Sequence, residues 1–289
     1  MKIKKAVIPA AGLGTRVLPA TKALPKEMFP LIDKPAIQYI VEEAVESGIT
    51  DILIILNRGK DIIEDHFDRV PELEEHLILH DKIDMLDIIK GISNLANIHF
   101  IRQKQAKGLG HAVRCAKTFV GNEPFAVLYG DDVIISQKHV CAQLIEAYNE
   151  YGLGVVAAKE MPREEMYKYG SLKVQKLKNN IFKCTDMIEK PKPGEIMSLY
   201  SILGRCILPA EIFNILDNTM NGVLGEIQLT DAMKVLAQTQ GMITVDFEGK
   251  HYDIGNKLGL MKACVEIALN HKEIGNDFRI YLKNLTEKL

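Results

Sequence analysis

Residues 5–35 read KAVIPAAGLGTRVLPATKALPKEMFPLIDKP, and this stretch decides both the start of the fold and the first candidate site. The apolar run at 6–10 predicts a buried strand. A turn of small residues follows, and it contains Gly12 and Gly14. Because glycine has no side chain, backbone N–H groups in this turn can approach a phosphate closely. The stretch therefore predicts an anion-binding turn directly after a strand.

Two cations, Arg16 and Lys26, follow the turn closely enough to share a ligand with it. A backbone cradle with two cations suits a nucleoside triphosphate. A dinucleotide fingerprint would need a third small residue where Val17 stands and an acid near Asn57, after the second strand. A Walker-type loop would close on Gly-Lys-Ser/Thr, which is not found in this turn. A bare Gly-x-Gly is usually only a turn, so the whole string carries the inference.

The composition is that of an ordinary globular protein. Of 289 residues, 47% are hydrophobic and 26% are charged, which allows a sizeable core. The 36 basic and 38 acidic side chains nearly balance, so we expect neither nucleic acid nor a membrane as a partner. The five cysteines are odd in number and have no Cys-x-x-Cys spacing, which indicates reduced thiols in a cytoplasmic protein.

Helices and apolar strands alternate in the first half of the chain. The spacing predicts a helix over 34–48, followed by a fully apolar strand at 51–56. Further strands are predicted at 97–102 and 124–128. This βαβ pattern predicts the α/β class, with a Rossmann-like, doubly wound sheet that is mixed but mostly parallel.

The sequence pattern changes after Gly152, where short predicted strands replace the alternation of helices and strands. Runs at 153–159, 171–175 and 180–184 predict a β-rich insertion. No long linker separates the halves, so we expect one domain over 1–289. Its expected parts are a nucleotide-binding core at 1–150, a β-rich part at 151–255, to which the family resemblance described below assigns the sugar phosphate, and C-terminal helices at 256–289.

Two acidic positions are candidate metal ligands. Asp131 and Asp132 follow the apolar strand at 124–128, and the carboxyl ends of parallel strands are where open α/β sheets bind ligands. Paired carboxylates suit Mg²⁺, although an Asp-Asp turn that caps the next helix explains the pattern equally well. Asp253 lies between a strand and a helix and has the same two interpretations.

Three strings in the opening stretch together form a specific signature: GLGTR at 12–16, LPATK at 18–22 and PKEM at 25–28. They resemble the sugar-1-phosphate nucleotidyltransferase family, most of all its uridylyl-transferring members, and the resemblance recurs along nearly the whole chain. It implies transfer of uridylyl from UTP to α-D-glucose 1-phosphate, giving UDP-glucose and pyrophosphate. The attack would be in line and assisted by Mg²⁺.

The resemblance also implies roles for individual residues. The expected catalytic residues are Arg16, Lys26 and Lys190, and the expected metal ligands are Asp131 and Asp253. The residues expected to contact substrate include these two acids together with Ala11, Gly12, Gly14, Thr15, Gln105, Gly110, Gly170, Glu189, Gly204 and Glu226. Gln105 and Gly110 would contact the uracil, and Gly170, Glu189 and Gly204 the glucose. Cys206 stands where the family pattern has an aromatic residue, which puts that wall of the sugar pocket in doubt.

Three other functions stay open at this point. One is a sister nucleotidyltransferase that uses dTTP or another sugar 1-phosphate. The second is a dinucleotide-dependent oxidoreductase, which Val17 disfavours, and the third is a binding module without activity. An apolar stripe on the last helix is either core or an oligomer contact, and as a contact it predicts a homodimer or homotetramer; its members are Phe278, Tyr281, Leu282, Leu285 and Leu289.

Overall fold

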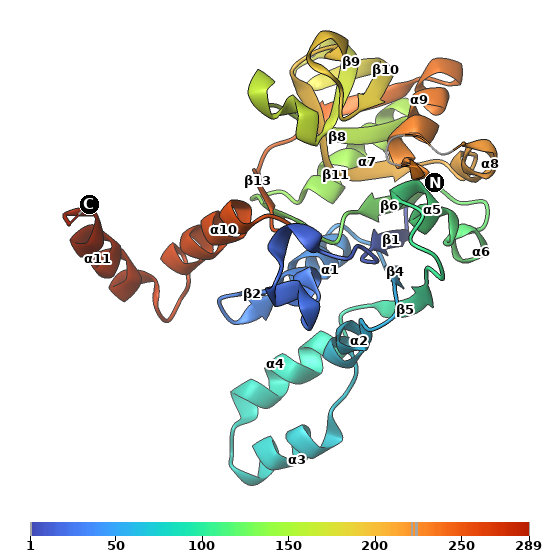
Figure 1. Cartoon of the computed structure of the whole chain (residues 1–289). Helices are drawn as coiled ribbons and strands as arrows, with labels where there is room; N and C mark the ends of the chain where they lie inside the picture. Colours follow the sequence, from blue (N-terminus) through green and yellow to red (C-terminus); the bar gives the residue numbers. More distant parts are fainter. Residues whose placement is uncertain (1, 221, 223–224, 289) are drawn as a thin grey trace.

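A single nine-stranded sheet runs through the computed structural model, which describes residues 2–220, 222 and 225–288 (Figure 1). The strand order is β5-β4-β1-β6-β11-β8-β12-β10-β9. The bounds of these strands are β1 Lys5–Pro9, β4 Asp51–Leu56, β5 Asn97–Arg102, β6 Phe125–Leu128, β8 Gly154–Glu160, β9 Gly170–Lys178, β10 Ile181–Glu189, β11 Tyr200–Leu208 and β12 Met242–Asp246.

The sheet is mixed, and most of its strands point the same way. β5, β4, β1 and β6 are parallel neighbours, as are β8 and β12. Only β10 and β11 of the nine run opposite to the rest, because each pairs antiparallel with both of its neighbours in the sheet order. The prediction of an α/β fold with a mixed sheet is therefore confirmed.

Helices cover both faces of the sheet. The α-helices are α1 Ala36–Glu46, α2 Asp61–Phe67, α3 Pro71–Leu79, α4 Ile83–Ser93, α5 Leu109–Arg114, α6 Lys117–Val120, α7 Val140–Tyr151, α8 Ile212–Asn218, α9 Leu229–Thr239, α10 Lys257–Leu269 and α11 Gly275–Thr286. Short 3-10 turns are η1 Thr15–Val17, η2 Ala20–Lys22, η3 Lys26–Met28, η4 Arg163–Lys168 and η5 Pro193–Glu195.

The alternation of side chains along each strand separates two cores. On β1, Ala6 and Ile8 pack with α1 and α7, while Val7 points to the other face and packs with α5, α8 and α9. The same division holds on β4, where Ile54 lies in the first core and Ile55 in the second. This is the burial on both faces that a continuous apolar run indicates.

The β-rich second half continues the sheet of the first half. β11 joins the two halves by pairing with β6 on one side and β8 on the other. The insertion expected from the sequence is therefore an extension of one sheet and does not form a separate layer. A hairpin joins β9 to β10, and Asn179 in its turn has a φ of 43°.

A small two-stranded sheet brings a distant segment to the end of β6. β7 (Asp132–Ile135) pairs antiparallel with β13 (Lys250–Asp253), and the register places Asp132 opposite Asp253. The acids at 131–132 therefore precede a strand, so they are not the cap of the following helix. A second two-stranded sheet joins β2 (Pro30–Leu31) to β3 (Lys34–Pro35).

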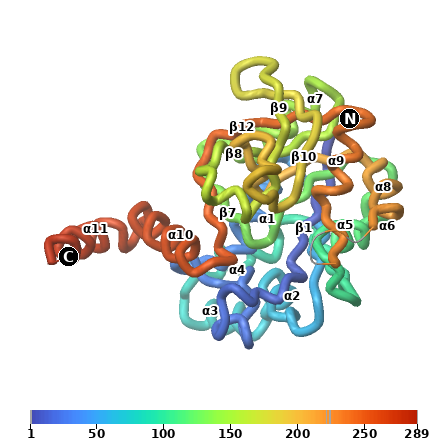
Figure 2. Tube along the Cα trace, turned by 45° about the horizontal axis from the view of Figure 1, so that its top comes forward, coloured from blue at the N-terminus to red at the C-terminus, as the bar shows by residue number. Residues whose placement is uncertain are grey.

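Two pairs of helices project from the body. Figures 1 and 2 both show α10 and α11, in red, extending away from the sheet as an arm, and Figure 1 shows α3 and α4 projecting below it. Among the described residues, no helix combines the length and the apolar character that crossing a membrane requires.

Candidate active site

The candidate site lies at the carboxyl ends of the four parallel strands β5, β4, β1 and β6. The turn at 11–15 follows β1, and Asp131 lies just after β6. Side chains after β4 hold the turn from behind: Asn57 Nδ2 donates to the Ala11 carbonyl at 2.8 Å, and Lys60 Nζ donates to the Ala10 carbonyl at 2.5 Å. These carbonyls point back into the protein, which leaves the N–H side of the turn free to face a ligand.

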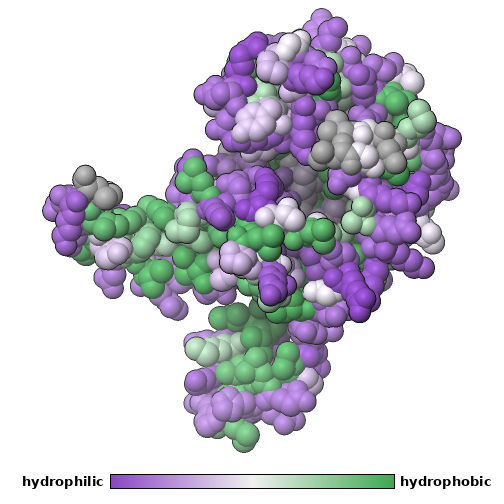
Figure 3. Space-filling view, in the orientation of Figure 1, coloured by the Kyte–Doolittle hydropathy of each residue, from purple (hydrophilic) through white to green (hydrophobic). Residues whose placement is uncertain are grey.

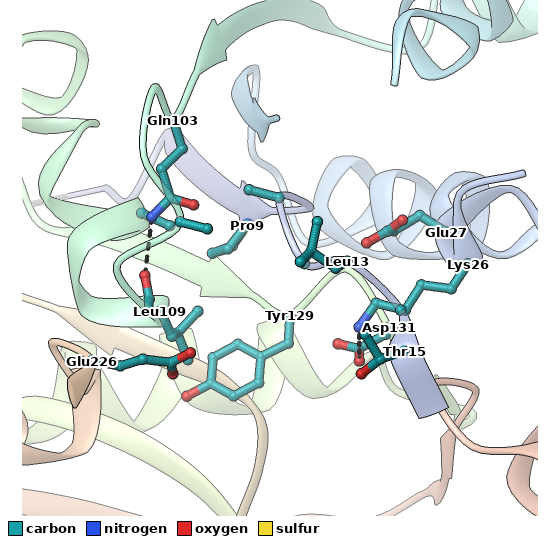
Figure 4. Close-up of a pocket in the computed structure, with 16 residues that line it drawn as sticks. Pro9, Leu13, Thr15, Lys26, Glu27, Gln103, Leu109, Tyr129, Asp131 and Glu226 are labelled. Atoms are coloured by element: carbon teal, nitrogen blue, oxygen red, sulfur yellow. Dashed lines mark hydrogen bonds and ion pairs between the residues drawn. The ribbon is translucent and has the colours of Figure 1, made fainter. Parts of the chain in front are cut away.

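A first pocket of about 410 Å³ opens over this turn (Figure 4). It is lined by Ala11, Gly12, Gly14 and Thr15 of the turn, by Lys26, Glu27 and Asp131, and by Gln103, Leu109, Tyr129 and Glu226, among others. The predicted phosphate-binding residues thus share one cavity with one predicted metal ligand. Figure 4 shows Lys26 and Asp131 at one end of this pocket and Gln103 at the other.

A second pocket of about 450 Å³ adjoins the first. It is lined by Arg16, Tyr169, Gly170, Glu189, Lys190, Thr230 and Asp253, among others. Leu109, Tyr129 and Asp131 line both pockets. Two ligands could therefore bind side by side and meet at Asp131.

Four charged side chains meet at the junction of the pockets. Arg16 binds Asp253 through both of its terminal nitrogens, with N···O distances of 2.8 and 3.2 Å. One of these nitrogens also lies 3.6 Å from Asp131 Oδ2, and Lys26 Nζ forms a close ion pair with the same oxygen. The predicted pairs of cations and acids are thus brought together, from segments more than 200 residues apart.

The environment shifts the pKa values of Asp131 and Asp132, the two neighbouring acids after β6, in opposite directions. Burial disfavours the charged form of Asp131, but Lys26 and Arg16 outweigh it and hold the pKa of Asp131 below its usual range. Burial raises the pKa of Asp132, and its contact with His251 Nε2 at 2.6 Å only partly offsets this effect. Asp131 is therefore the acid that stays ionised and available to a cation.

The geometry of Asp131 and Asp253 fits a divalent ion. A Cβ placed on Gly255 would lie 2.5 Å from Arg16 Nη2, 2.7 Å from Asp131 Oδ2 and 2.9 Å from Asp253 Oδ1, so the two carboxylates border one small space beside the guanidinium, which an ion would have to displace. Two carboxylates completed by phosphate oxygens and water form a typical Mg²⁺ site. Three or more His, Cys, Asp or Glu side chains do not gather around a metal position in the described chain.

Lys190 is held in an unusual backbone conformation at the second pocket. Its φ is 46°, a left-handed value that costs a residue other than glycine about 1–2 kcal/mol, and such strain is found often at functional sites. Next to it, burial raises the pKa of Glu189, although Thr230 Oγ1 donates to Glu189 Oε2 at 2.7 Å. The strained lysine and the adjacent carboxylate therefore face the same pocket.

The structure does not bring Gln105 into either pocket. Gln105 is exposed and is not among the residues that line the pocket, whereas Gln103, two positions earlier, is buried at the pocket wall. Gln103 directly follows β5, and its N–H donates to the Leu56 carbonyl at 2.7 Å. The position at the carboxyl end of a parallel strand was the signal that could have identified Gln103.

Two predicted glycines support the site without lining either pocket. The N–H of Gly110 donates to the Ile227 carbonyl at 2.8 Å, and a Cβ there would lie 2.9 Å from that oxygen. Gly204 has a φ of 60°, and a Cβ there would lie 2.6 Å from Asp132 Cβ. Both are therefore close-packing positions. Cys206 is buried in the second core and is not among the residues that line the second pocket.

A buried ion pair lies behind Asp132 and was not anticipated. Arg205 and Glu43 are almost completely buried, and Arg205 donates to both Glu43 oxygens at 2.7–3.1 Å. Arg205 also donates to the carbonyls of Gly204 and Asp132, each at 2.9 Å. The guanidinium thus connects α1, β11 and the start of β7.

Comparison with known proteins agrees with this geometry. The model of a family described as nucleotidyl transferase matches residues 5–269. A UTP–glucose-1-phosphate uridylyltransferase of Bacillus subtilis (strain 168) is 47% identical, over 99% of this chain and 98% of its own.

Solved structures are similar over the same extent. A UTP-bound UGPase from Acinetobacter baumannii has a TM-score of 0.91 at 39% identity, covering 98% of this chain and 99% of its own. A UDP-glucose pyrophosphorylase complexed with UDP-glucose has a TM-score of 0.85 at 40% identity, covering 93% of this chain and 100% of its own.

Replacing Gly204 with alanine should destabilise the protein more than an equivalent change in an open place. Gly152 has a similar φ of 65° in the left-handed helical region, and a Cβ placed there would meet nothing within 4 Å, so Gly152→Ala carries only the left-handed cost of about 1 kcal/mol. Gly204→Ala adds the overlap with Asp132 and should cost about 3 kcal/mol. Urea unfolding of both variants measures the difference in the free energy of unfolding. Equal losses of stability would show that the segment around Asp132 moves to accommodate the new Cβ without cost.

Proposed function

Because the chain belongs to the nucleotidyl transferase family, we propose that it transfers the uridylyl group of UTP to α-D-glucose 1-phosphate, releasing pyrophosphate and UDP-glucose. One observation carries this proposal: two adjoining pockets meet at an ionised carboxylate, with a phosphate-binding turn in one and a lysine–carboxylate pair in the other. This is the arrangement that a reaction between two phosphorylated substrates needs.

UTP would occupy the first pocket. Its base would lie at the end that contains Gln103, and its phosphates would lie over the turn at 11–15. Lys26 and Arg16 would move from the carboxylates to the triphosphate, whose charge attracts them more strongly. Both cations would then face the pyrophosphate as it leaves.

Glucose 1-phosphate would occupy the second pocket. Glu189 would accept hydrogen bonds from sugar hydroxyls, and Lys190 would hold the phosphate. A phosphate oxygen of the sugar then forms a bond to the α-phosphorus of UTP while the bond from that phosphorus to the bridging oxygen of pyrophosphate breaks. The attacking oxygen is already anionic, so the step requires no general base. The protein contributes alignment and charge neutralisation.

Asp131 and Asp253 would hold Mg²⁺ between the substrates. When bound, the ion would neutralise charge on the phosphate oxygens. Asp131 suits this role because its neighbouring cations keep it ionised in a buried place. The second acid, Asp253, reaches the site through the pairing of β13 with β7.

The proposal divides the work along the chain. Residues 1–150, with a Rossmann-like, doubly wound order, would bind the nucleotide, 151–255 would bind the sugar phosphate, and 256–289 would supply the C-terminal helices. The division is not strict, because Glu226 lines the first pocket. All five cysteines are free thiols, which supports a cytoplasmic setting.

Pyrophosphate release from a panel of substrates tests the function. We expect rapid release with UTP, glucose 1-phosphate and Mg²⁺ together, and a loss of at least about 100-fold when EDTA removes the metal. Asp131→Asn should lose a similar factor, while Asp217→Asn, at an exposed surface ion pair, should not. Faster turnover with dTTP or another sugar 1-phosphate would assign the chain to a sister activity, and full activity of Asp131→Asn would remove the metal assignment.

Lys190→Ala should raise the KM for glucose 1-phosphate by about 10- to 100-fold, because a charge-assisted contact is worth about 1.5–3 kcal/mol. The KM for UTP should change little, since Lys190 lines only the second pocket. Lys192→Ala, two residues away on the same exposed segment, is the matched control. Steady-state kinetics with each substrate varied in turn measures both KM values. An unchanged KM for the sugar phosphate would exclude Lys190 from binding it.

The arm of α10 and α11 supports the further proposal of a homodimer or homotetramer. Figure 3 shows hydrophobic side chains gathered along this arm. The exposed ones include Leu258, Met261, Ile280 and Tyr281, each more than half exposed. Of α11 only Gly275 is buried, and an isolated helix of 12 residues is marginal in water. Phe278 and Leu282 of the predicted stripe are half-buried, and Leu289 lies outside the described residues.

The α11 helix of a second copy fits a groove at the root of the arm. This groove measures about 920 Å³ and includes the apolar side chains Tyr39, Ile88, Ile92, Leu95 and Ile267. Its wall carries five carboxylates and three lysines, whereas α11 carries Arg279 and Lys283 against Asp277 alone. Opposite charge and matching apolar surface favour a reciprocal exchange of arms.

Tyr281→Asp should convert the oligomer to monomer, because it places a charge in the apolar stripe. Asn276→Asp adds the same charge to the polar side of the same helix and should leave the assembly intact. Sedimentation velocity measures the oligomeric state of both variants. A monomeric wild type, or an oligomer that survives Tyr281→Asp, would contradict the exchanged arm.

A further inference from the structure

The carboxamide of Gln103 is fixed in one orientation by two acceptors. Its Nε2 donates to the Gly108 carbonyl at 3.1 Å and to His111 Nδ1 at 2.8 Å. A carbonyl oxygen can only accept, so the amide nitrogen must be the atom that faces Gly108. Oε1 must therefore lie on the opposite side, and Figure 4 shows it pointing away from that hydrogen bond. The pocket wall thus presents an acceptor.

His111 is the second of these acceptors and lies on α5. To accept from Gln103, Nδ1 must carry no proton, which leaves the proton on Nε2. Burial, with Arg114 and Lys107 nearby, lowers the pKa of His111 and so favours the neutral ring. Gly108 and His111 together use both N–H bonds of the amide, so neither is left for a ligand.

An acceptor at this position discriminates between nucleobases. With the N3 edge of the base toward Gln103, uracil presents an N–H donor that Oε1 can accept, whereas N3 of cytosine is a lone pair and would repel it. A site built to pair with a donor rejects an analogue that lacks the donor, because a buried polar group is left unsatisfied. Thymine has the same N3–H as uracil, so this contact separates uracil from cytosine and not from thymine.

We propose that His111 is a specificity-determining positioning residue, which fixes the polarity of the Gln103 carboxamide so that the pocket takes a uracil nucleotide in preference to a cytosine nucleotide. This inference rests on the proposed function in assuming that the first pocket holds the base with its N3 edge toward Gln103. His111 acts through Gln103 and does not itself line the pocket. Without the imidazole acceptor, one hydrogen bond that sets the amide orientation is lost.

Two variants of His111 separate positioning from packing. His111→Leu fills a similar volume but offers no acceptor, whereas the amide oxygen of His111→Asn reaches about the place of Nδ1. Titration calorimetry with UTP and with CTP, and kcat/KM for each, give the UTP/CTP preference. We expect the preference to fall about five- to tenfold in His111→Leu, the factor for one hydrogen bond, and to be largely retained in His111→Asn.

The controls keep this test apart from that of the overall function. Both variants should unfold at the same temperature as the wild type, and their KM for glucose 1-phosphate should stay at the wild-type value. A folded His111→Leu that retains the full preference for UTP overturns the role of His111 and leaves the proposed function intact. If the wild type releases no pyrophosphate, the proposed function fails, yet calorimetry still decides here: equal affinity of the wild type for UTP and CTP overturns the inference.

Discussion

The ionised state of Asp131, whose side chain is only 22% exposed, is the constraint on which the site depends. A carboxylate moved away from water loses several kcal/mol of hydration unless cations replace it. Lys26 and Arg16 supply that replacement, and Arg16 joins Asp131 to Asp253. The phosphate-binding turn, the end of β6 and the distant strand β13 are thus tied together by charge. The same cations are the groups that a triphosphate would attract, so the balance that stabilises the free protein also prepares it for anionic ligands.

The Arg205–Glu43 pair fixes the backbone on which those charges depend. A buried ion pair contributes little net stability compared with apolar residues, but removing one partner is costly. Here the guanidinium also binds the carbonyls of Asp132 and Gly204. It therefore sets the position of the segment that follows Asp131, and Gly204 lets β11 approach that segment closely. The main effect of this ion pair is therefore to position the backbone beside the second pocket, and its net contribution to stability is small.

The sequence predicted the parts of the molecule that obey local rules. Strands at 51–56 and 97–102, the turn at 12–14 and the acid at Asp131 follow from apolar runs, glycines and strand ends. It did not distinguish Gln103 from Gln105, which have the same chemistry, because the contacts that hold Gln103 at the pocket wall, such as its hydrogen bond to the end of β4, are not local. The roles of Gly204 and Arg205 depend on contacts across the sheet, which no local pattern encodes.

The shared sheet has a mechanical consequence. β11 hydrogen-bonds to the parallel half through β6 and to the remaining strands through β8, so the two pockets lie along one continuous sheet. Such a sheet opposes a hinge between the halves of the chain that carry the two pockets. Adjustment around ligands must come from the short segments above the strand ends, such as η1–η3 and η4, and a substitution in the middle of β11 would disturb affinity for both ligands at once.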